Sequence, residues 1–562
     1  MKILGFTLTA LCAALGVHAY NSAYDLTLNR TAMNSSVGHE TNRPLIHYTP
    51  RVGWMNDPNG LFFDEETSLW HVYYQYKPDA LVAGLPIFWG HATSKDLTSW
   101  VDHGVAIEPA DDVSGAFSGS IVIDRNNTSG FFDNSTLPGQ RIVALYTEDS
   151  SSKQSQFAAY SLDGGYTFNY YAQNPVLDIN STQFRDPKVI WHDETQRWVM
   201  TLALSQEYKI QIYTSKNLKT WNFQSNFSHY GFLGYQYECP GLSKVPVLQS
   251  VDPNTTLASN NSSSVDFKWV MFLSINPGAP TGGSVNQYFI GDFDGKTFTA
   301  DDSASRFVDN GKDFYAMQTF SDTPTNEVVG LAWASNWDYG AYVPITPWKT
   351  SMTLARNLTL RPYKPNPESS QLTLYSEPII DHSILNTTQS IKKASLNLTT
   401  EESVFYHLTK TAKGLLEFTL EWKVNATAIT SKKSPAAMTF NLRGIEDEEE
   451  FLKLGYEVNS GAFFLDRGIS DLDFVRFNPL FTTRLVHFLE PYRIDQDGLP
   501  VYKVHGIVDK DIVELFFNDG SSTSTNTFYM SEENFLGTVE LSSSVDDVFN
   551  VLNLEIKQLN TM

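Results

Sequence analysis

The stretch SKDLTSW at residues 94–100 recurs as SKNLKTW at residues 215–221, and looser copies lie at 161–168 and 292–298. The copies begin roughly 55 to 75 residues apart, somewhat more than one four-stranded blade of a β-propeller with its loops. A region of about 320 residues holds about five such units. The repeat therefore predicts a five-bladed propeller, although each copy alone is also typical of an ordinary hairpin turn.

The distribution of tryptophan indicates a second domain. Eleven of the 12 tryptophans lie at or before Trp348, and only Trp422 follows. The stretch 361–370 is polar and rich in proline, as is typical of a linker. We therefore predict a propeller over residues 43–362, a linker or crossing segment over 363–395 and a second domain over 396–562.

The second domain shows the alternation of half-buried strands. Apolar and polar side chains alternate over residues 416–424, which places one face in a core and the other in water. Turn sequences at 459–461 and 518–520 adjoin strand-like runs, which predicts antiparallel hairpins. The expected fold class is all-β, a five-bladed β-propeller followed by a C-terminal β-sandwich of roughly 160 residues.

The first residues have the pattern of an export signal. In residues 1–19, Lys2 supplies a positive charge, an apolar run follows, and Ala19 is the small residue expected before cleavage. Residues 20–42 would form an N-terminal extension. Cys12 leaves with the signal, so only Cys239 remains and no internal disulfide is expected. Fourteen Asn-X-Ser/Thr matches indicate N-glycosylation. We therefore expect a heavily glycosylated, secreted eukaryotic protein.

Charge excludes two classes of partner. With 40 basic and 63 acidic residues the net charge is −23, which repels phosphate backbones and anionic lipid. We therefore expect no nucleic acid and no membrane among the partners. Aromatic residues reach 13% while charged residues are only 18%, a balance that favours a large folded core over disorder.

Three carboxylates lie in turn-like settings beside proline. Asp57 stands in WMNDPNG at 54–60, Asp186 in FRDP at 184–187 and Glu238 in YECP at 237–240. Proline fixes its own φ and restricts the residue before it, which could stiffen each carboxylate. Each acid taken alone is more typical of a turn. Because they fall in separate expected blades, whose first strands converge on one axis, we expect them to form one cluster.

Such a cluster suits hydrolysis of a glycosidic bond, which needs a carboxylate and a carboxylic acid flanking the bond. Neighbouring carboxylates repel each other, so one should hold its proton longer than the others. We expect the adjacent cation of Arg185 to hold Asp186 ionised. A neutral sugar is recognised by aromatic stacking and hydrogen bonds. The candidate substrate contacts are Trp54, Asn56, Gln75, Trp89, Phe117, Ser118, Asn336 and Trp337.

Competing chemistries lack their motifs. The sequence has no glycine-rich phosphate loop, no His-Glu-X-X-His pair and no Gly-X-Ser-X-Gly elbow. We interpret His91 and His103 as hydrogen-bonded structural residues. Cys239 has no obvious histidine partner and is interpreted as a small packing residue rather than a nucleophile. Neither a metal nor another cofactor is expected.

Five blocks in order, at 54–60, 117–120, 184–188, 234–241 and 333–337, resemble those of glycoside hydrolase family 32. Among its members, the secreted β-fructofuranosidases of yeasts are most similar, and exo-inulinases nearly as similar. The resemblance runs from about residue 43 to the end of the chain and includes 463–468 and 524–527. Five ordered blocks are specific, whereas Asn-Asp-Pro-Asn alone would not be.

The resemblance implies a five-bladed propeller followed by a β-sandwich, and retaining hydrolysis of terminal non-reducing β-D-fructofuranosides. Sucrose is the first expected substrate, with raffinose and inulin-type fructans beside it. Matched block by block, Asp57 would be the nucleophile, Glu238 the general acid/base and Asp186 a transition-state stabiliser. The family's sugar contacts match Trp54, Asn56, Gln75, Phe117, Ser118, Arg185 and Trp337. The resemblance also implies a homodimer or a larger homo-oligomer, and the extracellular, cell-wall or periplasmic space of a fungus.

Other functions remain open at this point. An exo-inulinase or a fructosyltransferase would share the same motifs, and an inverting arabinan-type hydrolase could share the propeller. From a different class, the chain could be a catalytically inactive sugar-binding lectin of the cell wall. The intact trio of acids argues against the lectin, because a binding module does not need all three.

Overall fold

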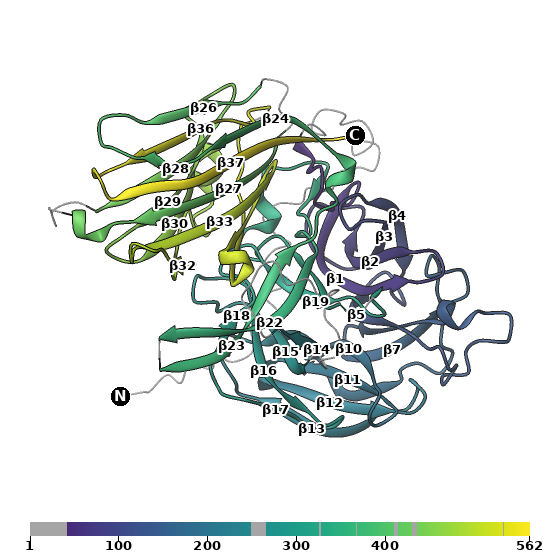
Figure 1. Cartoon of the computed structure of the whole chain (residues 1–562). Helices are drawn as coiled ribbons and strands as arrows, with labels where there is room; N and C mark the ends of the chain where they lie inside the picture. Colours follow the sequence, from purple (N-terminus) through teal and green to yellow (C-terminus); the bar gives the residue numbers. More distant parts are fainter. Residues whose placement is uncertain are drawn as a thin grey trace, which may run out of the picture.

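The computed structural model describes residues 42–248, 266–324, 327–366, 368–409, 414–429, 435–531 and 533–562. Strands dominate both an N-terminal domain of radial sheets and a C-terminal domain of two sheets (Figure 1). The expected signal peptide and all but the last residue of the expected extension lie outside these ranges. Within them, no helix has the length and apolar character needed to cross a membrane.

The N-terminal domain contains five four-stranded antiparallel blades. Blade 1 consists of β1 (Gly53–Asp64), β2 (Leu69–Lys77), β3 (Phe88–Ser94) and β4 (Val101–Ile107). Blade 2 consists of β5 (Gly115–Ile123), β6 (Ile142–Asp149), β7 (Gln154–Ser161) and β8 (Asn169–Tyr170). Blade 3 consists of β10 (Phe184–His192), β11 (Arg197–Leu204), β12 (Lys209–Ser215) and β13 (Asn222–Ser228).

Blades 4 and 5 complete the ring and are joined where β14 meets β22. Blade 4 consists of β14 (Tyr237–Val247), β15 (Asp266–Ile275), β16 (Val285–Phe293) and β17 (Phe298–Ala300). Blade 5 consists of β19 (Tyr315–Thr319), β20 (Val329–Trp333), β22 (Arg356–Asn366) and β23 (Ser369–Pro378). Short strands β9 (Leu177–Ser181), β18 (Arg306–Phe307) and β21 (Trp348–Lys349) add to blades 2, 4 and 1.

The first strands of the blades form a closed ring. Strand β1 contacts β5 and β19, β10 contacts β5 and β14, and β14 contacts β19. Strand β21, which follows β20 in the chain, pairs in parallel with β1 and so ties the end of the propeller to its beginning. The predicted propeller is confirmed, and the chain reaches the central axis five times.

The repeated sequence forms the turn between the third and fourth strands of blades 1 to 4. In blade 1 the carboxylate of Asp96 accepts hydrogen bonds from the two N–H groups after Leu97, at 2.8 and 2.6 Å. Leu97 itself has φ +61°. The equivalent residues with positive φ are Leu218, Gly164 and Gly295. The repeat thus preserves a side-chain acceptor followed by a left-handed residue, and in two blades a buried leucine takes that position despite its strain.

The C-terminal domain is a sandwich of two antiparallel sheets. One sheet contains β24 (Leu385–Lys393), β25 (Leu396–Asn397), β27 (Leu415–Val424), β32 (Arg493–Ile494), β33 (Pro500–Asp509), β34 (Ile512–Phe517), β35 (Ser522–Thr527) and β37 (Phe549–Thr561). The other contains β26 (Val404–His407), β28 (Ala437–Gly444), β29 (Phe451–Glu457), β30 (Ala462–Ile469), β31 (Arg484–Phe488) and β36 (Leu536–Ser543). The helix α3 (Leu472–Phe477) lies between β30 and β31 in the chain.

Strand β27 has the alternation that its sequence predicts. Phe418, Leu420 and Trp422 are buried in one core that both sheets share, whereas Glu421 and Lys423 are partly exposed. The predicted hairpins form as β29–β30 and β34–β35. The β-sandwich predicted for the C-terminal domain is therefore confirmed.

The structure differs from the sequence-based expectation at the domain boundary. Residues 363–395 were expected to form a linker, but β22 and β23 make a hairpin of blade 5 that ends at Pro378, and β24 already belongs to the sandwich. Pro362 lies beyond the two residues of β22 that pair with β20, so its missing N–H breaks no bond to that strand. Strand β23 is an edge, where polar residues are common.

Buried charges join the two domains. His47, from the propeller side, lies 2.9 Å from Asp509 and 3.1 Å from Glu514 of the sandwich. Arg356 of β22 donates to the other oxygen of Glu514 at 2.6 Å and to Asp309 at 2.9 Å. Burial alone would lower the pKa of His47, but the two carboxylates outweigh it and raise that pKa to about 9.

This raised pKa predicts a loss of stability at alkaline pH. The contribution of His47 is fully present below its unfolded pKa of 6.5 and disappears as pH rises toward 9, by on the order of 3 kcal/mol. The difference in melting temperature between the parent and His47→Gln should therefore shrink from pH 6.5 to pH 9. His487, whose pKa is lowered to about 4, is the control. Its Gln variant should show a constant difference over the same range, and a constant difference for His47→Gln would contradict the assignment.

Candidate active site

The site lies where all five inner strands are irregular. Each inner strand loses register with its neighbour near its N-terminal end, and the shifts fall at Met55/Pro58, Phe117/Gly119, Arg185/Lys188, Glu238/Gly241 and Tyr315/Gln318. A bulge of this kind re-aims side chains that a regular strand would alternate. The three predicted carboxylates stand at such shifts on β1, β10 and β14.

Proline and unusual backbone angles mark the same positions. Asp186 has φ +66° and Cys239 has φ +46°, and each is followed by a proline. Ala316, at the shift in β19, has φ +55°. Proline at a bulge sacrifices no ladder hydrogen bond. Non-glycine residues in the left-handed region cost free energy, so the surrounding structure must hold them there.

Asp57 is buried and held at both oxygens. Its Oδ2 accepts a hydrogen bond from the hydroxyl of Ser118 at 2.9 Å, and its Oδ1 accepts one from the Asn56 amide at 3.1 Å. The Asn56 carbonyl oxygen in turn accepts from the Trp54 indole at 2.8 Å. Burial raises the pKa of Asp57 and the charge of Glu238 adds to it, while the bonds from Asn56 and Ser118 act in the opposite direction.

Asp186 adjoins Asp57 through Cys239. The Cys239 N–H donates to Asp186 Oδ2 at 2.9 Å, and its Sγ lies 3.4 Å from Asp57 Oδ2 and 3.7 Å from Asp186 Oδ2. Burial raises the pKa of the Cys239 thiol well above its usual value, so the group is a neutral thiol. Cys239 is thus more than the packing residue that the sequence indicated, since it contacts two of the three acids.

Glu238 accepts hydrogen bonds on both oxygens, from Arg185 and Tyr315 of two other blades and from Gln236 just before β14. Its Oε1 accepts from Arg185 Nη2 at 2.8 Å and from Gln236 at 3.0 Å. Its Oε2 accepts a short hydrogen bond from the Tyr315 hydroxyl on β19. Glu238 is the most exposed of the three acids, with 15% of its side chain accessible against 5% for Asp186.

The expectation that Arg185 keeps Asp186 ionised is wrong. Arg185 Nη2 lies 2.8 Å from Glu238, whereas its nearest approach to Asp186 is 4.0 Å. Burial, together with the charges of Glu238 and Asp57, outweighs Arg185 and raises the pKa of Asp186 to about 7. At mildly acidic pH Asp186 therefore carries a proton.

An aromatic wall stands beside the acids. The ring of Trp54 lies 5.8 Å from that of Trp337, which lies 5.0 Å from that of Trp333. Trp54 and Trp333 are fully buried, while Trp337 and Phe117 are partly exposed. The exposed part of this wall can stack on a sugar ring.

Three of the predicted contacts donate hydrogen bonds to backbone carbonyls. Gln75 donates to the carbonyl of Ala116 at 2.9 Å, and Trp89 donates to that of Phe117 at 3.0 Å. Asn336 donates to the carbonyl of Lys312 at 2.7 Å. All three side chains are buried, and Trp89 lies in the core between blades 1 and 2. The backbone acceptors therefore fix the orientation of all three side chains.

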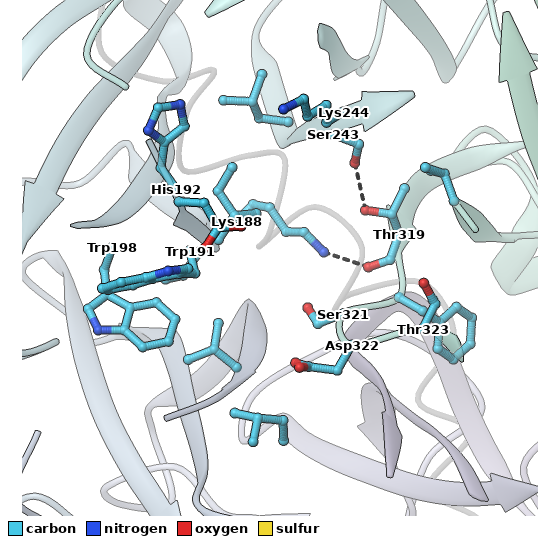
Figure 2. A pocket seen from close by; sticks show the side chains of 18 of the residues that line it. Lys188, Trp191, His192, Trp198, Ser243, Lys244, Thr319, Ser321, Asp322 and Thr323 are labelled. Carbon is cyan, nitrogen blue, oxygen red and sulfur yellow. Dashed lines mark hydrogen bonds between the residues drawn. The ribbon is translucent and has the colours of Figure 1, made fainter. Parts of the chain in front are cut away.

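A separate cavity of about 720 Å³ opens toward the C-terminal ends of the inner strands. Figure 2 shows Lys188 reaching across it to the carbonyl of Thr319, at 2.5 Å, and Ser243 bonded to the Thr319 hydroxyl. Burial lowers the pKa of Lys188 to about 7. None of the predicted site residues lines this cavity, so its size does not make it the sugar site.

Tyr315 and Gln236 are site residues that the sequence did not indicate. Gln236 precedes Glu238 by two residues, and its only signal is its place in the block at 234–241. Tyr315 lies in no recognisable motif, and its only signal is its place at the start of the fifth inner strand. Among the described residues, no group of three or more His, Cys, Asp or Glu side chains is arranged to hold a metal ion.

Two family models match the chain, and their boundary coincides with the end of β23. Residues 47–378 match the N-terminal domain of glycosyl hydrolases family 32, and residues 381–558 match the C-terminal region of the same family. Together the two models cover both the propeller and the sandwich.

Individual relatives and solved structures agree with these models. An invertase of Debaryomyces hansenii is 51% identical, over 92% of this chain and 94% of its own. An extracellular exo-inulinase of Meyerozyma guilliermondii is 46% identical, over 92% and 96%. The structure of a fructofuranosidase of Schwanniomyces occidentalis in complex with fructose is 48% identical, covers 93% of this chain and 99% of its own, and has a TM-score of 0.86. With both domains matched over nearly their whole length, the chain belongs to glycoside hydrolase family 32.

Proposed function

We propose that this protein is a retaining β-fructofuranosidase that releases terminal fructose from sucrose. The observation that carries the proposal is the cluster of Asp57, Asp186 and Glu238 beside an aromatic wall. Hydrolysis of a glycosidic bond requires two carboxyl groups in different roles, and retention is what the family resemblance implies. The relatives named invertase and fructofuranosidase support the choice of substrate.

In the first step, Glu238 acts as the general acid. It gives its proton to the glycosidic oxygen as the bond to the anomeric carbon of fructose breaks, so glucose departs as an alcohol. Asp57, ionised, attacks the same carbon and forms a covalent ester to the fructosyl group. The hydrogen bonds from Ser118 and Asn56 orient its two oxygens for this attack.

In the second step, the roles reverse. Glu238, now anionic, takes a proton from water, whose oxygen attacks the anomeric carbon and displaces Asp57. Two inversions leave the configuration unchanged. Asp186 would bind fructosyl hydroxyls throughout, and with its pKa at about 7 it can donate as well as accept a hydrogen bond.

Exo-inulinase activity is the second candidate. An exo-inulinase relative of 46% identity favours it, since the same acids would serve a longer fructan. A sugar acceptor in place of water in the second step would give fructosyl transfer. Relative rates on sucrose and inulin, with a search for longer oligosaccharides at high sucrose, separate these activities.

Removing either reacting carboxylate should abolish most activity. Asp57→Asn keeps the shape but cannot form the ester, and kcat/KM on sucrose should fall on the order of 10⁴-fold or more. Glu238→Gln should cost 10²- to 10⁴-fold on sucrose, but less on an aryl β-fructofuranoside, whose leaving group needs no proton. Circular dichroism checks folding. A folded Asp57→Asn protein that hydrolyses sucrose at the parental rate would overturn the assignment.

The acid limb of the pH profile should depend on Ser118. Activity requires ionised Asp57, so kcat/KM rises with pH through the pKa of this group. The Ser118 hydrogen bond favours the charged form of Asp57, so Ser118→Ala raises the pKa of Asp57 and moves the acid limb toward higher pH. Ser120→Ala is the control, because Ser120 donates to the Pro187 carbonyl instead. Equal acid limbs in parent and Ser118→Ala would contradict this role.

We also propose a secreted homodimer or larger homo-oligomer. The exo-inulinase relative is described as extracellular. In the sandwich, β31 is an edge strand that exposes Val486 and Phe488, and Phe477 of α3 is 72% exposed. Such apolar edges are commonly covered by a partner. Light scattering of the deglycosylated protein should give at least twice the mass of one mature chain, which is somewhat below the 63.2 kDa of the full sequence, and the mass of a single chain would refute assembly.

A further inference from the structure

One arginine of the sandwich domain is buried where this domain contacts the propeller. Arg467, on β30, has no exposed surface. Its guanidinium donates to Asp313 at 2.5 Å, to the Tyr339 hydroxyl at 2.9 Å and to the carbonyls of Thr527 and Thr482 at 2.6 and 2.9 Å. Asp313 and Tyr339 belong to the propeller, so this side chain connects the domains. Asp313 lies two residues before Tyr315, and Tyr339 lies two residues after Trp337, so both adjoin residues of the candidate active site.

The contacts of Asp313 connect Arg467 to Glu238. Residues 309–313 run along β35 of the sandwich, with the Asn310 N–H donating to the Thr523 carbonyl at 2.8 Å and the Asp313 N–H donating to that of Thr525 at 3.1 Å. The Asp313 carboxylate also accepts from the N–H of Thr527 at 2.8 Å. Two residues later, Tyr315 opens β19 and donates to Glu238 Oε2. The sandwich therefore fixes the segment that carries the Glu238 partner.

The segment that ends at Tyr339 connects Arg467 to the aromatic wall. Tyr339 donates a short hydrogen bond to Asp313 and ends the segment that carries Trp337. Gly340, the next residue, lies against Trp54, since a Cβ there would be 3.4 Å from the indole ring. Trp54 in turn holds Asn56, which holds Asp57. The Arg467 contacts thus continue on one side to Glu238 and on the other to Asp57.

We propose that Arg467 is a positioning residue of the active site, through which the sandwich domain sets the placement of Glu238 relative to the sugar-stacking wall. The proposal rests on the proposed β-fructofuranosidase function. A guanidinium suits the task because its planar fork can bind Asp313 and Tyr339 at once, which a lysine ammonium on a flexible stem cannot reproduce.

The test compares Arg467→Lys with the parent on two substrates. At a temperature well below both melting points, kcat/KM of the variant on sucrose should fall at least tenfold. The fall should be at least threefold smaller on an aryl β-fructofuranoside, because only sucrose depends on proton donation from Glu238. A loss of folded protein alone would lower both rates equally. The proposal would be overturned if the ratio of kcat/KM on sucrose to kcat/KM on the aryl substrate were the same in Arg467→Lys as in the parent.

A second variant and a control complete the design. Tyr339→Phe keeps the ring but removes the hydroxyl shared by Asp313 and Arg467, so it should shift the same ratio in the same direction, even if Arg467→Lys fails to fold. Arg443→Lys weakens an arginine–carboxylate pair with Glu540 within the sandwich and should leave the ratio unchanged. An equal shift in Arg443→Lys would overturn a specific role for Arg467. If the parent hydrolyses neither substrate, the proposed function fails rather than the positioning role.

Discussion

The architecture depends on a ring of five inner strands whose hydrogen-bonded ladders are all interrupted at one level. In a regular strand alternate side chains point away from the axis. The bulges interrupt this alternation at the positions of the three acids. The backbone groups released in this way find other partners. Cys239 donates its N–H to Asp186, and Gln75 bonds to the carbonyl of Ala116. The irregular level is therefore stabilised by the same side chains that surround the site.

Burial then governs the electrostatics. Three carboxylates share a small space with one guanidinium, and that guanidinium binds Glu238 rather than the acid beside it in sequence. Burial and the two neighbouring charges raise the pKa of Asp186 to about 7, so this carboxyl group carries a proton at mildly acidic pH. One protonated carboxyl group reduces the repulsion that three charges would produce and adds a donor for a sugar hydroxyl.

Much of this could be predicted from the sequence, and the exceptions have physical causes. The turn repeat could be detected because each copy needs an acceptor and a left-handed residue at fixed spacing, as at Asp96 and Leu97. The acids stood out because proline follows them. Tyr315 has no such local signal, since its role arises only when the fifth strand meets the fourth. The pairing of Arg185 depends on distances across blades, and the pKa of Asp186 depends on burial. The segment at 363–378 resembled a linker because an outer hairpin and a linker share a polar, proline-containing composition.

The seam between the domains limits how this chain can be divided. Many multidomain proteins carry their modules on spacers, and such modules can be exchanged or removed. Here each half supplies counter-charges to the other: Asp313 of the propeller meets Arg467, and His47 meets Asp509 and Glu514. Cutting the chain after Pro378 would leave uncompensated ions on both new surfaces. The sandwich and the propeller therefore form one folding unit, and substitutions at the seam residues of either domain have to be tolerated by both.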